Sequence, residues 1–105
     1  MPVSTRERIP HPDVAAFDLA TIMRALGDPV RLEIVNILSD GGEYQCGDLS
    51  QRLQIPSSTA SYHLKLLREA GVTRTRAEGT QRLISLRTTD LESRFPGLVG
   101  VLTAS

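Results

Sequence analysis

The sequence has little of several residue types, and each shortage excludes a class of protein. Its 105 residues include one cysteine, two histidines, two tyrosines, two phenylalanines and no tryptophan. A single cysteine rules out an internal disulfide framework and fits a reducing compartment. No apolar run approaches the roughly 18 residues that a membrane-spanning helix needs, and the N-terminus lacks the apolar core of a signal peptide. We therefore expect one small cytoplasmic domain.

The same scarcity argues against catalysis. His11, His63 and Cys46 form no nucleophile and base pair, and the sequence has neither paired carboxylates on one helix face nor a glycine-rich phosphate loop. We predict no enzymatic activity and no cofactor. A chain this short with so few aromatic residues buries only a modest core, so we expect support from a second copy of the chain.

The formal net charge is zero, but the charges are unevenly distributed. Residues 1–51 carry four arginines and eight acidic residues, whereas residues 52–87 carry seven basic residues and two acidic ones. An ordinary solvated surface would also explain such a cluster. A surface that faces nucleic-acid phosphates explains it better, because the basic residues follow one another through one segment.

Apolar periodicity predicts helices in the first half of the chain. We expect residues 1–12, with three prolines, to be a flexible tail in which His11 is exposed. Asp13 is a candidate N-cap for a first helix that ends at Gly27. Its apolar face is broad for so small a chain, so this helix either packs centrally or meets another subunit. Asp28 and Pro29 then begin a second helix, which the glycines at 41–42 follow.

A helix-turn-helix is indicated by the next two helices. Leu49 and Leu53 mark a short third helix, Pro56 ends the turn after it, and a longer helix runs from Ser57 to Ala70. Ser57 or Ser58 is the candidate N-cap of this longer helix. Gly71 provides its left-handed exit.

The helix over residues 57–70 has two faces. Ala60, Leu64 and Leu67 form a packing face. Hydroxyl, phenol and ammonium groups near a helix N-terminus suit phosphates and base edges, and the opposite face carries Ser58, Ser61, Tyr62 and Lys65. We therefore predict a DNA-reading helix. His63 lies beside the packing face, so we favour a structural contact over a base contact for its ring.

After Gly71 the spacing of the apolar residues no longer follows a helical period and instead suits β-strands. Residues 72–76 and 81–87 are predicted to form two strands joined across 77–80. Arginines on both arms favour a wing that reaches the phosphate backbone or a minor groove, although an ordinary solvated hairpin would show a similar pattern. Pro96 opens a final helical segment with four aliphatic residues, which we expect the first helix of this chain or of a partner to cover.

Three motifs in this order resemble the ArsR-type winged helix-turn-helix repressors. They are ALGDPVRL at 25–32, SYHLKLLREAGV at 61–72 and RAEGT at 76–80, and the resemblance extends over about residues 14–103. It implies a mainly α fold with a small β-hairpin and a single DNA-binding and dimerisation domain over residues 13–105. It also implies a homodimer joined through the first and last helices. Members of this family bind operator DNA and usually release it when an inducer binds.

The resemblance assigns residues to three roles by position. The recognition helix would use Ser57, Ser58, Thr59, Ser61 and Tyr62 in the major groove and Lys65 on a phosphate. The wing would use Arg74, Arg76, Gly79 and Arg82. The dimer interface would include Leu19, Ile22, Leu98, Val101 and Leu102.

The metal-sensing segment of that family is altered in this sequence. Residues 43–49 read EYQCGDL, in which Gln45 and Gly47 occupy the two cysteine positions and Cys46 lies between them. A soft-metal site needs several thiolate or imidazole ligands, and no histidine follows His63. We predict no metal site and no paired-thiol redox sensor, and we expect Cys46 to be a small buried apolar residue. An effector of unknown chemistry remains open.

Two functions are compatible with this pattern. The first is a transcriptional regulator, expected to be a repressor, that binds a pseudo-palindromic operator as a dimer. The second is a winged helix that serves only as a dimerisation or protein-docking module. The basic segment and the small polar outward face favour DNA, because docking faces more often present apolar anchors.

Overall fold

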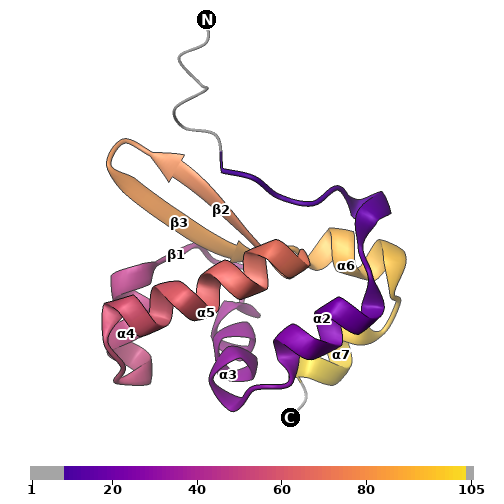
Figure 1. Cartoon of the computed structure of the whole chain (residues 1–105), viewed down its shortest axis with the longest axis horizontal. Coiled ribbons are helices and arrows are strands. Elements are labelled where there is room, and N and C mark those ends of the chain that lie inside the picture. The colour runs from indigo at the N-terminus through magenta and orange to yellow at the C-terminus, as the bar shows by residue number, and fades with distance from the viewer. Residues whose placement is uncertain (1–8, 104–105) are drawn as a thin grey trace, which may run out of the picture.

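The computed structural model describes residues 9–103 and confirms a mainly helical winged helix-turn-helix fold (Figure 1). In Figure 1, α5 crosses the centre of the molecule, α4 lies at one end of it, and the β2–β3 hairpin extends along the side opposite α3. No helix in the described part of the chain is long and apolar enough to cross a membrane. The elements are η1 (Val14–Ala16), α2 (Leu19–Leu26), α3 (Pro29–Leu38), β1 (Tyr44–Gln45), α4 (Cys46–Leu53), α5 (Ser57–Ala70), β2 (Thr73–Glu78), β3 (Gln81–Leu86), α6 (Thr88–Arg94) and α7 (Leu98–Thr103).

The first long helix begins later than predicted. Asp13 precedes only the short 3-10 helix η1, and its side chain makes no capping hydrogen bond. Asp18 instead caps α2, because its carboxylate accepts hydrogen bonds from the backbone N–H of Thr21 at 3.0 Å and from its hydroxyl at 2.7 Å. Between the two helices Phe17 is extended and only 5% exposed. The prediction of one continuous helix from Asp13 is therefore wrong, since the core takes the Phe17 ring and Asp18 is the effective N-cap.

The second helix begins as predicted, and its first turn is tied to two other helices. Asp28 accepts hydrogen bonds from the backbone N–H groups of Val30 and Arg31 at 2.9 and 3.1 Å. The Arg31 guanidinium donates to the carbonyl of Ala25 at 2.5 Å and lies 3.0 Å from Nδ1 of His63 on α5. The structural contact predicted for His63 is thus confirmed, and Arg31 joins α2, α3 and α5.

The helix-turn-helix has the predicted boundaries but a different cap. α5 spans Ser57–Ala70, and its N-cap is Pro56, with no side-chain capping hydrogen bond. The predicted serine cap is wrong because Ser57 is already the first helical residue. In the turn, Gln54 adopts a left-handed conformation with a φ of 56° and takes the place that glycine often fills. Gly71 ends α5 with a φ of 91°, as predicted.

The wing is part of a three-stranded antiparallel sheet with strand order β1-β3-β2. Strands β2 and β3 pair from Thr73 opposite Leu86 to Glu78 opposite Gln81, so the connecting turn has two residues rather than the four predicted. The strand β1 was not predicted. It has only two residues, of which Tyr44 pairs with Ile84, and such a short segment shows no periodicity.

The core includes side chains from the helices and from both arms of the wing. Ile22, Ile34, Leu38, Leu49, Leu67, Leu91 and Val72 are fully buried. α7 packs against α3 and α6 of the same chain, and Leu102 is only 8% exposed. Ile22 and Leu102, expected at a dimer interface, therefore lie in the protomer core, whereas Leu19, Met23 and Val101 are 45%, 42% and 70% exposed.

Candidate nucleic-acid interface

The recognition helix α5 presents the two faces that the sequence predicts. Ala60, Leu64 and Leu67 are buried. The residues predicted to contact DNA lie on the other side, where Ser57, Ser58, Ser61, Tyr62 and Lys65 are exposed and Thr59 is half-buried. The Tyr62 side chain is 58% exposed, and its ring meets the His63 ring edge-on with the centroids 5.7 Å apart. α5 therefore offers an external partner a surface of small hydroxyls and one phenol.

Cys46 joins the two helices of the helix-turn-helix. It begins α4 and is half-buried, which differs from the fully buried position expected for it. Its sulfur lies 3.4 Å from the Ser61 hydroxyl and 3.8 Å from the Ser57 carbonyl oxygen. These contacts place the thiol directly behind the exposed face of α5.

Two of the predicted wing arginines are paired with carboxylates of this chain. Arg74 lies 3.2 Å from Asp90. Arg76 donates two hydrogen bonds to Glu43, at 2.7 and 2.8 Å, and lies 3.0 Å from Glu78. The hydrogen bond from Arg76 lowers the pKa of Glu43, and Glu43 raises the pKa of Arg76, so both groups stay charged. All five side chains of these pairs are partly exposed, and such pairs are weak enough to exchange partners.

Two exposed cations without an ion pair lie on α5 and β3. Lys65 and Arg82 are exposed, and neither forms an ion pair with any residue between 9 and 103. Gly79 stands in the turn of the wing with a φ of 63°, and a side chain there would meet nothing within 4 Å. A phosphate backbone approaching this face would therefore meet a free ammonium and a free guanidinium beside an unobstructed wing tip.

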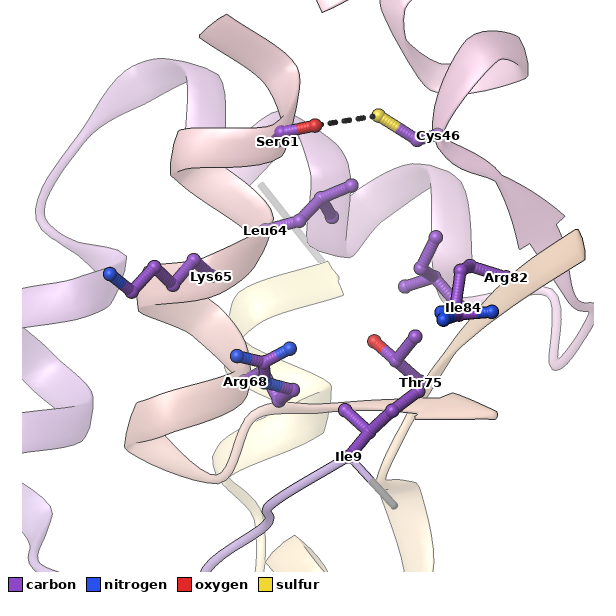
Figure 2. Close-up of a pocket in the computed structure, with 9 residues that line it drawn as sticks. All are labelled: Ile9, Cys46, Ser61, Leu64, Lys65, Arg68, Thr75, Arg82 and Ile84. Carbon is purple, nitrogen blue, oxygen red and sulfur yellow. Dashed lines mark hydrogen bonds between the residues drawn. The ribbon is translucent and has the colours of Figure 1, made fainter. Parts of the chain in front are cut away.

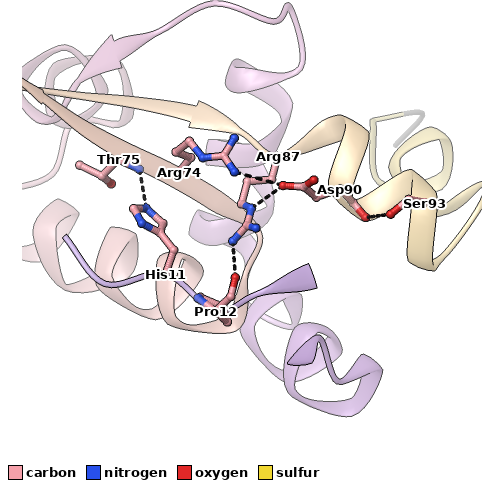
Figure 3. A network of polar contacts seen from close by, with 7 residues as sticks. All are labelled: His11, Pro12, Arg74, Thr75, Arg87, Asp90 and Ser93. Carbon is pink, nitrogen blue, oxygen red and sulfur yellow. Dashed lines mark hydrogen bonds and ion pairs between the residues drawn. The ribbon is translucent and has the colours of Figure 1, made fainter. Parts of the chain in front are cut away.

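Arg87 belongs to the interior rather than to the basic surface in which the sequence pattern placed it (Figure 3). It is only 5% exposed, and its guanidinium donates to Asp90 and to the carbonyl of Pro12, each at 3.0 Å. It also lies 4.9 Å from the centre of the Phe17 ring. Arg87 therefore fixes the described N-terminal segment against β3 and α6.

His11 lies against the wing instead of in an exposed tail. Its Nε2 accepts a hydrogen bond from the backbone N–H of Thr75 on β2 at 3.0 Å, and the residue is half-buried. Burial lowers the pKa of His11, as do the charges of Arg87, Arg74 and Arg68, while a hydrogen bond with the Ile9 backbone raises it. The expectation of an exposed His11 was wrong because β2 is an edge strand, so some of its N–H groups have no strand partner. His11 supplies an acceptor for one of them. Residues 1–8 of the predicted tail lie outside the described residues.

Sequence reasoning missed Arg68. It follows Lys65 by three positions on α5, a spacing that places the two on one flank of the helix. Its Nε is buried and has no hydrogen-bond partner among the described residues. The spacing was a usable signal, but the burial of that nitrogen is seen only in the folded chain. For metals, residues 9–103 bring together no group of three histidine, cysteine, aspartate or glutamate side chains that could hold an ion.

Comparisons with known proteins agree with this geometry. The sequence profile described as "Bacterial regulatory protein, arsR family" matches residues 28–74. YceK of Bacillus subtilis, named as an HTH-type transcriptional regulator, is 40% identical over 84 residues, which cover 79% of this chain and 84% of YceK.

Solved structures of the same fold match over most of the chain. The crystal structure of the transcriptional repressor BigR from Xylella fastidiosa has a TM-score of 0.66 and 34% identity, covering 82% of this chain and 80% of BigR. The solution structure of a homodimeric winged helix-turn-helix DNA-binding domain, Mb0332 of Mycobacterium bovis, has a TM-score of 0.69 and 28% identity, covering 82% and 78%. The chain therefore belongs to the ArsR family of DNA-binding transcriptional regulators, a family of regulators rather than enzymes.

Proposed function

We propose that this regulator is a repressor that binds a pseudo-palindromic operator as a homodimer and reads base edges with α5. The observation that supports it most directly is the exposed polar face of α5 beside two cations that have no partner in the described chain, Lys65 and Arg82. Small hydroxyl side chains such as Ser58 and Ser61 allow the helix to approach a groove floor closely and can donate to or accept from base edges.

The dimer would place two copies of α5 in successive major grooves, about 34 to 36 Å apart. In this arrangement Lys65 and Arg82 contact phosphates, which fixes the register of the protein without reading sequence. Ser58, Ser61 and Tyr62 supply the sequence-dependent contacts. Arg74 and Arg76 add to the wing contact only by leaving Asp90 and Glu43. Repression would follow from occupation of a promoter, in line with the repressor role named for BigR.

The proposed repressor does not use the metal-sensing segment of its family. Gln45 and Gly47 stand at the positions of the two ligand cysteines, and neither side chain is a soft-metal ligand. The Cys46 thiol is engaged with α5 rather than with a second thiol or imidazole. We therefore propose that residues 43–49 do not bind a soft metal as the signal that releases this protein from DNA.

A fluorescence-anisotropy titration of the metal-free protein tests the proposal. The labelled duplexes are the DNA upstream of its own gene and a scrambled duplex of equal composition, each at two salt concentrations. We expect tight, salt-dependent binding to the first duplex and weak binding to the second. Ser61→Ala should change the preferred sequence, whereas Lys65→Ala should weaken binding to every sequence. Equal weak binding to both duplexes would contradict the proposal and favour the protein-docking alternative.

A further inference from the structure

A cavity of about 240 Å³ lies between α5 and the wing (Figure 2). One part of its wall is aliphatic and is formed by Leu64 of α5, Ile84 of β3 and Ile9 of the N-terminal segment. The other part is polar and includes Arg68, Arg82 and Thr75. With Cys46 of α4, the cavity is thus built from four parts of the chain: the N-terminal segment, α4, α5 and the wing.

Positive charge in this cavity has no internal counterion. Arg68 and Arg82 approach it from opposite walls, and no carboxylate is among its lining residues (Figure 2). The Nε of Arg68 is buried and has no hydrogen-bond partner in the described chain. Arg68 also lines the cavity, where a carboxylate would pair with the terminal nitrogens of its guanidinium. The arginines outside the cavity on the wing side differ, because Arg74 and Arg76 each hold a carboxylate.

Lys65 differs from the two cavity arginines. Its stem lines the rim, but in Figure 2 its ammonium group extends away from the strands. That direction leaves Lys65 available for a DNA phosphate while Arg68 and Arg82 surround the cavity. The cavity and the DNA-facing surface therefore overlap at Ser61, the Lys65 stem and Arg82, whereas Arg68, Leu64 and Ile84 belong to the cavity alone.

The lining indicates the chemistry of an occupant. Guanidinium groups pair well with carboxylates, often through two hydrogen bonds. A DNA phosphate has no apolar part that could pack against the aliphatic wall. A small organic acid would cover Leu64 and Ile84 with its apolar part. The volume lies below the roughly 300 Å³ at which drug-sized sites begin, so the ligand must be small.

We propose that this cavity binds a small carboxylic acid with an apolar body and that its occupancy weakens DNA binding. The coupling rests on the proposed function, because an acid that holds Arg82 removes that guanidinium from the DNA backbone. The acid also places negative charge beside α5, where the phosphates would lie. By linkage, DNA must weaken binding of the acid by the same factor.

The single cysteine provides a direct test of the cavity without DNA. Cys46 lines the cavity, so its rate of alkylation by iodoacetamide reports only on this site. Benzoate and hexanoate are the probes; benzyl alcohol lacks the charge, and inorganic phosphate lacks the apolar body. We expect the two acids to slow alkylation several-fold in a saturable manner, and we expect the two controls to leave it unchanged.

Two variants assign the effect to the cavity arginines. Arg68→Met and Arg82→Gln should abolish protection by the acids, and Arg82 is exposed enough to be replaced without disturbing the core. Arg74→Gln is the matched control, because Arg74 pairs with Asp90 outside the cavity, and it should keep the protection. No saturable protection by either acid, equal protection by benzyl alcohol or phosphate, or protection that survives both cavity variants would overturn the site.

Anisotropy titrations with and without saturating benzoate, at matched ionic strength, test the coupling. We expect benzoate to weaken operator binding by about fivefold or more, and Arg82→Gln to remove this effect. Unchanged operator affinity in a protein whose Cys46 is protected would overturn the coupling. A protein that shows Cys46 protection but no selective DNA binding would instead refute the proposed function, so the two failures are distinguishable.

Discussion

Two arginines on the wing should differ in their effect on DNA binding although both are exposed. Arg82 has no ion-pair partner in the described chain, while Arg76 is held by Glu43 and Glu78. We expect Arg82→Ala to weaken binding to all sequences and to reduce the slope of log affinity against log salt by about one. Arg76→Ala should change the slope less, because Arg76 must first leave its carboxylates. Equal slopes for the two variants would contradict this difference.

His11 should make stability depend on pH. Its folded-state pKa is lowered below the ordinary value of 6.5, chiefly by burial and then by Arg87, Arg74 and Arg68, and its Nε2 must be unprotonated to accept from Thr75. Because the unfolded chain binds this proton more readily, the contribution of His11 is fully present above pH 6.5 and is lost as pH falls through 6.5 toward the lower folded value.

Urea denaturation of the wild type and His11→Gln at several pH values checks this expectation. The glutamine oxygen can still accept from Thr75 but does not titrate in this range. The wild type should lose more stability than the variant between pH 7.5 and 5.5. Parallel losses would assign the pH dependence to groups other than His11.

Individual residue roles could be predicted where the partner is close in sequence. Asp28 caps the helix that it precedes, and the exposure of Lys65 follows from its place outside the packing face of Ala60, Leu64 and Leu67. The pairing of Arg76 with Glu43 was not predictable, since 33 residues separate the two and the pairing of both β1 and β2 with β3 brings them together. Formal charge counted along the sequence therefore overstated the number of cations free to meet phosphate.

The junction between α5 and β2 depends on a glycine for two reasons. Gly71 has a φ of 91°, and a Cβ on it would lie 2.5 Å from the Phe17 ring. We expect Gly71→Ala to lower the free energy of unfolding by about 2 to 4 kcal/mol, from left-handed strain and overpacking together. Gly47→Ala in α4 is the control, because a Cβ there meets nothing within 4 Å, and it should stabilise by roughly 0.5 to 1 kcal/mol.

Urea unfolding of the two variants and the wild type gives both changes in the free energy of unfolding. They follow from the shifts in midpoint, provided that the m-values are equal. A Gly71→Ala protein as stable as the wild type would mean that Phe17 moves aside freely. The packing of this single ring against Gly71 would then contribute little to fixing η1 and α2 relative to α5.

The bounds of α5 were predictable from local signals at its two ends. α5 begins and ends where expected because Pro56 and Gly71 bound it locally. The interruption at Phe17 was not predictable, because it depends on a core position beside Gly71 that exists only in the folded chain. The same reason explains β1, which consists of two residues that the edge of β3 orders by pairing.

At the scale of the whole molecule, the protomer leaves several large apolar side chains exposed. Leu19 and Met23 on α2 and Val101 on α7 are exposed, although the core of the same chain buries the neighbouring Ile22 and Leu102. A protein of this size gains stability by covering such side chains, at about 1.5 to 3 kcal/mol for each large aliphatic residue. We propose that a second copy of the chain covers them, which makes the dimer a consequence of the small core.

Val101→Asp should therefore separate dimerisation from folding. Val101 is 70% exposed in the protomer, so an aspartate there leaves the core intact but places a charge in the proposed interface, where burial without a partner is costly. Sedimentation velocity should show monomer where the wild type is dimeric, and operator affinity should fall at least about tenfold, because linked half-sites bind far more tightly than separate ones. Tyr62→Ser, on the exposed face of α5, should weaken DNA binding and leave the dimer unchanged. If Val101→Asp sediments like the wild type, the interface lies away from α7, and the exposed residues of α2 become the next position to test.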